Sequence, residues 1–113
     1  MSSFKIPSGL LSRCAGNKKV CKLVIGKYVE QMTLDVSEIS SLIETNALAV
    51  SKLAHRIKGA SANVGAEELR SSAEQIEKLA SKKDLVAAKP IAKDLEKHWT
   101  EYRTLTAEFL SKT

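Results

Sequence analysis

Four stretches of the chain carry apolar residues at intervals of three and four, and short polar segments separate them. Such spacing places the apolar side chains on one face of an α-helix. The first stretch predicts a helix over 18–44, with a stripe formed by Cys21, Ile25, Tyr28, Met32, Val36, Ile39 and Ile43. Helices with one apolar face bury it by packing together. The pattern therefore predicts an all-α, antiparallel up-down four-helix bundle.

Residues with known preferences at helix ends mark the limits of the next two helices. Asn46 suits the N-cap of a helix over 47–64, because its side chain can accept a hydrogen bond from a free backbone N–H group. Gly65 suits the position that follows the end of this helix. A third helix is predicted to begin near Ala66 and to end in the cationic run 81–83, the polarity that the helix dipole favours.

The two ends of the chain carry the remaining elements. Residues 1–16 are predicted to form a leader with a short helix over 8–14, and Asn17 is a candidate N-cap for the bundle domain at 17–113. Within the last helix, Pro90 predicts a kink or a start near Lys89, because proline lacks a backbone donor. The stripe of this helix is Leu85, Ala88, Ala92, Leu95, Trp99, Tyr102, Thr106 and Phe109.

The sequence excludes several classes of protein. No apolar run approaches the roughly 18 residues of a membrane span, and the first eleven residues lack the apolar core of a signal peptide. Cys14 and Cys21 do not form a CxxC pair, and the chain has no further cysteines. We therefore expect neither a zinc site nor a disulfide framework. A reduced, cytoplasmic protein is the corresponding prediction. The GxGxxG, Walker and HExxH signatures are absent.

The second helix carries a histidine on the side away from its apolar stripe. Helical geometry places His55 roughly 140° from the centre of the stripe, where a core histidine would not lie. Gly59 lies one turn further on, and glycine there lowers helix stability by about 1 kcal/mol relative to alanine. It either leaves the imidazole open to another surface or serves close packing between helices. Lys58 adds a cation that attracts anions. The three residues together describe an accessible nucleophile beside an anion site.

The run from His55 to Ala66 reads HRIKGASANVGA and resembles the HxxKGxSxxxGA signature of the histidine-containing phosphotransfer (HPt) domains of bacterial phosphorelays. The resemblance extends over 10–110. It implies that His55 accepts a phosphoryl group from a receiver-domain aspartate and passes it to a second receiver. It further implies that Lys58 steadies the phosphoryl oxygens and that Gly59 clears space for the receiver. Such a domain is a phosphocarrier without kinase machinery of its own.

The resemblance also implies partners. They are the receiver domains of response regulators and a hybrid sensor histidine kinase, and the receiver supplies Mg²⁺, so no cofactor or metal is expected on this chain. We expect a monomer without nucleic acid and without membrane insertion. The helix surface around His55 is predicted to dock the receiver through Ser51, Lys52, Arg56, Gly59 and Ala62. A basic cluster would complement the receiver's acidic pocket; it comprises Lys52, Arg56, Lys58 and Arg70.

Two alternatives stay open. The net charge of +5 is compatible with a basic helical adaptor or nucleic-acid-binding bundle, which would be retained on heparin in a steeply salt-dependent way. Gly59 does not fit this alternative, because a protein that binds the phosphate backbone gains nothing from a residue without a side chain beside a histidine. A degenerate domain that binds receivers without transfer is the second alternative. His98, beside Trp99 in the last helix, is predicted to be structural or merely exposed.

Overall fold

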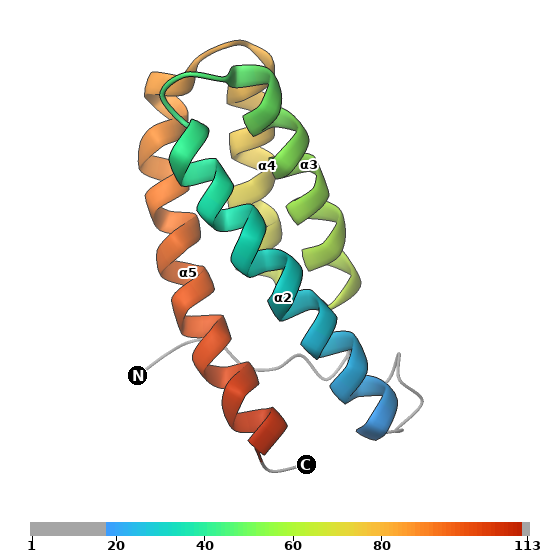
Figure 1. The fold of residues 1–113 in the computed structure, drawn as a ribbon. Helices are drawn as coiled ribbons and strands as arrows, with labels where there is room; N and C mark the ends of the chain where they lie inside the picture. Colours follow the sequence, from blue (N-terminus) through green and yellow to red (C-terminus); the bar gives the residue numbers. More distant parts are fainter. Residues whose placement is uncertain (1–17, 112–113) are drawn as a thin grey trace.

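The computed structural model describes residues 18–111, which form four helices and, within that range, no strand (Figure 1). They are α2 Lys18–Leu42, α3 Ala47–Asn63, α4 Glu67–Ser81 and α5 Leu85–Ser111. The predicted all-α four-helix bundle is confirmed, and α2 runs unbroken. The predicted leader over 1–16, its short helix and the N-cap at Asn17 lie outside the described residues.

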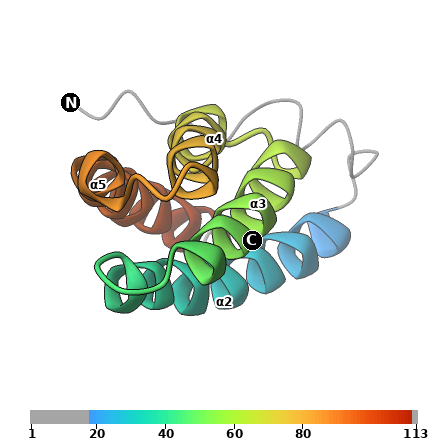
Figure 2. The same cartoon turned by 90° about the horizontal axis from the view of Figure 1, so that it is seen from above.

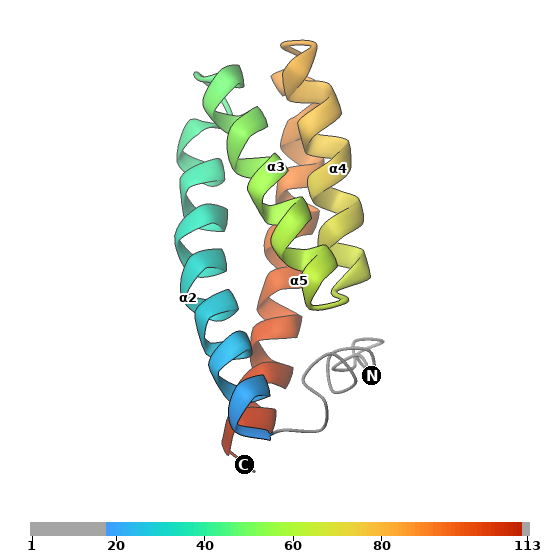
Figure 3. The ribbon, with the colours of Figure 1, turned by 90° about the vertical axis from the view of Figure 1, so that its right-hand side faces the viewer.

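The four helices form a ring in the order in which they follow one another along the chain. Figure 2 looks along the bundle and shows α2 beside α3, then α4, then α5, which closes against α2. The most extensive contact is between α3 and α4. Because α3 and α4 are shorter, the start of α2 and the end of α5 extend beyond them (Figures 1 and 3). One side of α3 faces solvent and includes the exposed residues Lys52, His55 and Gly59.

The ends of α3 follow from the residues expected there. The side-chain oxygen of Asn46 accepts a hydrogen bond of 3.0 Å from the backbone N–H of Ala49, as predicted for an N-cap. Gly65 has a φ angle of 71°, in the left-handed region that favours glycine, and this conformation lets the chain turn into α4. Both helix ends are confirmed, and so the register that orients His55 is set by local sequence.

Helix α5 begins earlier than expected. Of the predicted kink or start near Lys89, the start is wrong, because α5 begins at Leu85 and continues through Pro90. Asp84 explains the early start: its carboxylate accepts a hydrogen bond of 3.1 Å from the backbone N–H of Ala87 and so caps the helix. Pro90 removes one hydrogen bond near this end, and the cap together with packing against α4 outweighs that loss.

The interior contains the apolar stripes of all four helices. Tyr28, Trp99 and Tyr102 form an aromatic cluster with ring centroids 5.7–6.3 Å apart, and the hydroxyl groups of Tyr28 and Ser61 are hydrogen-bonded at 2.8 Å. Ser61 is thus a packing residue of α3. The side chain of Phe109 is not among those described. No helix within residues 18–111 is both long enough and apolar enough to cross a membrane.

One cysteine departs from the expectation. Cys21 is fully buried and disulfide-bonded, so the prediction of reduced cysteines is wrong for this residue. The spacing of the two cysteines is unlike that of zinc sites or of frameworks with several bridges, but it is compatible with a single bridge. Cys14 lies outside the described residues.

Candidate functional site

His55 lies on the outward side of α3, with 70% of its side chain exposed. The expected position away from the apolar stripe is confirmed. Its Nδ1 atom lies 2.7 Å from Oε2 of Glu77, which projects from the neighbouring helix α4. The exposed imidazole is therefore anchored at one nitrogen only, and Nε2 has no hydrogen bond to any residue within 18–111.

Glu77 also binds the lysine of the motif. Nζ of Lys58 donates a hydrogen bond of 2.6 Å to Oε1 of Glu77, while the other carboxylate oxygen faces His55. Lys58 and Glu77 are half-buried, with 31% and 21% of their side chains exposed. One carboxylate thus joins the imidazole and the ammonium group across the α3–α4 contact.

The chemistry of a carboxylate determines which imidazole nitrogen carries the proton. The hydrogen bond from the Lys58 ammonium is the main reason that the pKa of Glu77 lies below its ordinary value of 4.5; burial opposes this effect and the His55 contact adds to it. The contribution of this bridge to the free energy of unfolding is present above pH 4.5, and it is lost as the pH falls through the lowered pKa of Glu77. An ionised carboxylate only accepts hydrogen bonds, so Nδ1 of His55 donates, and in the neutral ring Nε2 holds the lone pair.

We expect this tautomer to depend on Glu77. In two-bond ¹H–¹⁵N spectra of the neutral ring, the wild-type protein should show His55 protonated at Nδ1. In Glu77→Ala the imidazole loses its acceptor and should shift toward the mixture of tautomers found in free histidine. Glu74→Ala, one turn earlier on α4, removes a carboxylate that contacts Arg70 and should leave the His55 spectrum unchanged. An unchanged tautomer in Glu77→Ala would contradict this assignment.

Gly59 lies on the same outward surface, one turn after His55. A Cβ atom added at this position would meet nothing within 4 Å. Gly59 is exposed, so it does not serve close packing between helices. The opening beside His55 that the sequence predicts is therefore present, and its use by a partner stays a prediction.

Three other residues of the predicted docking surface lie on α3 around His55. Lys52 and Ala62 are exposed, whereas Ser51 is half-buried and its hydroxyl oxygen lies 3.1 Å from that of Ser81 on α4. Ser51 therefore contributes to the α3–α4 contact as well as to the surface. Arg56, the remaining residue, is exposed on the side of α3 that faces α2, and it is also a neighbour of Gly59 on the helix surface.

Two cations of the predicted basic cluster are bound to acids of the same molecule. Arg56 donates from Nε and Nη2 to the carboxylate of Asp35 on α2, at 3.0 and 2.5 Å. Arg70 donates to Glu67, with a shortest distance of 2.5 Å, and to Glu74 at 3.1 Å. These ion pairs join α3 to α2 and neighbouring turns within α4.

The predicted basic cluster is thus largely neutralised. Three of its four members, counting Lys58, have acidic partners, and Lys52 alone makes no ion pair within the described part of the chain. Their acids come largely from α2 and α4, which the positions of the cations along the sequence do not reveal, and complementarity to a receiver stays a prediction.

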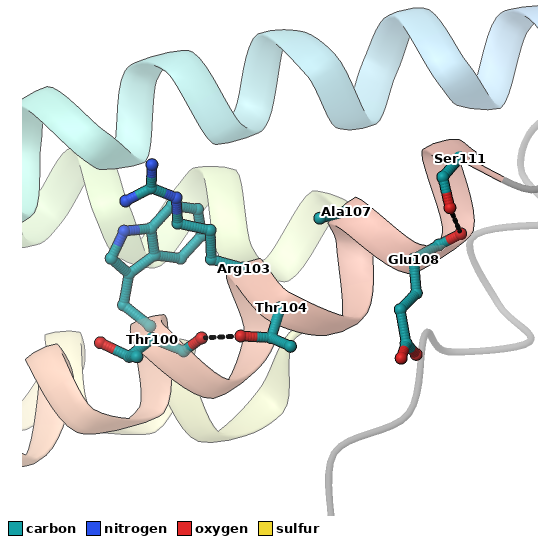
Figure 4. A pocket seen from close by; sticks show the side chains of 7 residues that line it. Thr100, Arg103, Thr104, Ala107, Glu108 and Ser111 are labelled. Carbon is teal, nitrogen blue, oxygen red and sulfur yellow. Dashed lines mark hydrogen bonds between the residues drawn. The ribbon is translucent and has the colours of Figure 1, made fainter.

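Among the described residues, neither the pocket on α5 nor the pocket beside His98 is lined by α3. A pocket of about 610 Å³ is lined, among described residues, by α5 alone, and Figure 4 shows the hydroxyls of Thr104 and Ser111 bonded back to the α5 backbone. His98 is half-buried and lines a separate pocket between α4 and α5. Within 18–111, no group of three or more His, Cys, Asp or Glu side chains is placed to hold a metal ion.

Sequence reasoning missed Glu77. It lies 22 residues after His55, on another helix, and no local spacing connects the two. Its position next to Ile76, which is fully buried, is the one available signal, because it places the carboxylate at the edge of the α4 stripe. Only the packing of α3 against α4 brings it to His55.

A family model described as Hpt domain matches residues 24–107, which include α3, α4 and most of α2 and α5. No curated protein and no solved structure matched the chain.

Proposed function

This chain belongs to the Hpt domain family, which implies a histidine phosphotransfer role in a phosphorelay, and we propose that His55 is its phosphoacceptor. The phosphoryl group comes from the aspartyl phosphate of one receiver domain and passes to the aspartate of another. The observation that carries this proposal is the hydrogen bond of 2.7 Å between Nδ1 of His55 and Glu77, because it leaves Nε2 with its lone pair facing solvent.

The transfer step follows from this arrangement. Nε2 attacks the phosphorus atom in line with the aspartyl oxygen; the N–P bond forms while the P–O bond breaks, and the aspartate leaves as a carboxylate. The ring becomes cationic as Nε2 bonds to phosphorus, since Nδ1 keeps its proton. The anionic Glu77 lies against that proton and stabilises the developing positive charge, much as the acid of a catalytic triad supports its histidine. Transfer to the second receiver reverses these bond changes.

Lys58 has a second role in the same step. Its ammonium group lies against Glu77 beside the ring, within reach of a phosphoryl group on Nε2 by the one-turn spacing along α3. A cation there neutralises part of the charge on the phosphoryl oxygens. The Mg²⁺ that phosphoryl transfer to and from aspartate requires belongs to the receiver in this proposal.

The partners and location follow from the same proposal. A hybrid sensor histidine kinase supplies the phosphoryl group through its receiver, and response regulators accept it in the cytoplasm. The chain acts as a monomeric carrier and turns over no substrate of its own. The ion pairs of Arg56, Lys58 and Arg70 also lower the free positive charge that the alternative nucleic-acid adaptor would need.

The proposal is tested by following the phosphoryl group. The chain is incubated with receiver domains from the same organism that carry labelled aspartyl phosphate, with Mg²⁺ present. We expect label to move to the chain and to be labile in acid and stable in base, as a phosphoramidate is. Addition of a second, unlabelled receiver should then remove it. Absence of label from the chain with every receiver would contradict the proposal.

Lys58→Ala should slow transfer while leaving the bundle folded. The free energy of unfolding should change by less than about 1 kcal/mol, because the lost ion pair is only half-buried. The rate of transfer, or the lifetime of the phosphorylated state, should fall about tenfold because a charge-stabilising donor is gone. Lys78→Ala on α4 removes an exposed lysine as a control and should leave both quantities unchanged. Wild-type kinetics in Lys58→Ala would mean that this lysine only supports the surface.

A further inference from the structure

Asp35 is a buried carboxylate in a position where the apolar stripe of α2 would otherwise continue. Only 2% of its side chain is exposed. It accepts hydrogen bonds from Nε2 of Gln31 at 2.9 Å and from two nitrogens of Arg56. A buried acid is costly unless it is paired and hydrogen-bonded in this way. Nothing in the transfer step described above uses it.

Arg56 is held by Asp35 along one edge only. A guanidinium group has five N–H donors, of which Nε–H and one Nη2–H bind the carboxylate. The other three make no hydrogen bond to any residue of the described chain, and 55% of the side chain is exposed. The two bonds to Asp35 fix the plane of the group, so its free edge points outward in one orientation.

Arg56 lies next to the opening beside His55 along the surface of α3. His55 and Arg56 precede Gly59 by four and three residues, so both are its neighbours on the helix surface. A protein that approaches His55 over Gly59 therefore also meets Arg56. Glu77 holds the imidazole from the α4 side and Asp35 holds the guanidinium from the α2 side.

We propose that Asp35 is a positioning residue, which holds Arg56 ready to bind a carboxylate on the rim of the receiver's phosphoacceptor pocket. This inference rests on the proposed function. Free N–H groups in the planar fork of an arginine match the two oxygens of a carboxylate. Because the side chain is already ordered, less conformational entropy is lost when the receiver docks.

The proposed contact depends on the orientation of the Arg56 guanidinium group more than on the net charge around it. Asp35 cancels the charge of Arg56, and Glu38 adds a further negative charge nearby. A lysine at position 56 would keep the charge and lose the fork. The structure thus distinguishes this contact from a general attraction between a basic surface and an acidic one.

The test measures the KM for phosphorylated receiver and the kcat of transfer separately. Arg56→Lys should raise KM about tenfold with kcat and phosphohistidine lifetime unchanged, since one charged hydrogen-bonding contact is lost. Asp35→Asn should raise KM by a similar factor, although residue 35 is too buried to touch a partner. The KM of the double variant should not exceed that of the single variant that binds more weakly, because both changes remove the same contact with the receiver. Arg103→Lys, on the exposed surface of α5, is the matched control and should leave KM unchanged.

Two outcomes overturn the inference. If Asp35 is only structural, Asp35→Asn lowers the melting temperature and the active fraction, and KM stays at the wild-type value. If Arg56→Lys, which keeps a cation beside Asp35 and so preserves folding, also has a wild-type KM, then no fork contact exists. Failure of the proposed function would look different, because the wild-type chain itself would take up no label.

Discussion

His55→Gln should take up no phosphoryl label from any phosphorylated receiver. The glutamine amide has no basic nitrogen, so no N–P bond can form at residue 55. The imidazole is 70% exposed, and its loss removes one surface hydrogen bond to Glu77, so we expect the variant to stay folded. The measurement is the amount of acid-labile, base-stable phosphate on the chain after incubation, with circular dichroism to verify the fold.

His98→Gln is the control for this loss. His98 is the other histidine of the chain; it is half-buried on α5 and lines a pocket whose described lining residues do not include Glu77 or Lys58. Its replacement should leave labelling intact. Full labelling of His55→Gln would reject the assignment, and loss of labelling in His98→Gln alone would move the phosphoacceptor to α5.

Local signals in the sequence predict most of the fold. The 3.6-residue periodicity locates the helices, and residues with strong preferences at helix ends locate the connections. Asn46 caps α3 through its side chain, and Gly65 takes the left-handed conformation after it. The start of α5 depends on the side chain of Asp84, which caps the helix five residues before the expected start at Lys89. That expected start followed from Pro90 alone and did not include the cap.

The outward position of His55 also follows from sequence, because it needs only the direction of one helix face. The partners of that face do not. Glu77 and Asp35 come from helices before and after α3, and only tertiary packing brings them to Lys58, His55 and Arg56. This is why the charge of the site was overestimated.

Asp35 does leave a signal in the sequence. It lies three residues after Met32 and four before Ile39, on the buried side of the helix, where an acid is rarely found without a partner. A charged residue on an apolar stripe indicates that another helix supplies the opposite charge. Periodicity alone does not say which helix supplies it, and Arg56 could be identified only from the structure.

Gly59→Leu should slow transfer by about 100-fold, the loss that displacement of reacting groups by about an ångström can cause. Gly59→Ala should have a smaller effect and Gly59→Gln an intermediate one, because a longer side chain fills more of the space over which the receiver approaches His55. The free energy of unfolding should not decrease in these variants. A Cβ at this position meets nothing within 4 Å, and alanine should raise the free energy of unfolding by up to about 1 kcal/mol. Transfer rates and melting temperatures of the three variants measure the two effects.

Gly26 provides a matched control for this series. It lies within α2, on a different helix from His55, and a Cβ there also meets nothing within 4 Å. Gly26→Ala and Gly26→Leu should therefore change stability in the same direction as their counterparts at 59 and leave the transfer rate unchanged. Equal loss of transfer at both positions would indicate a general effect of altered helices. A collapse of stability at Gly59→Ala would instead mean that the glycine serves packing, and the open surface beside His55 would then need another explanation.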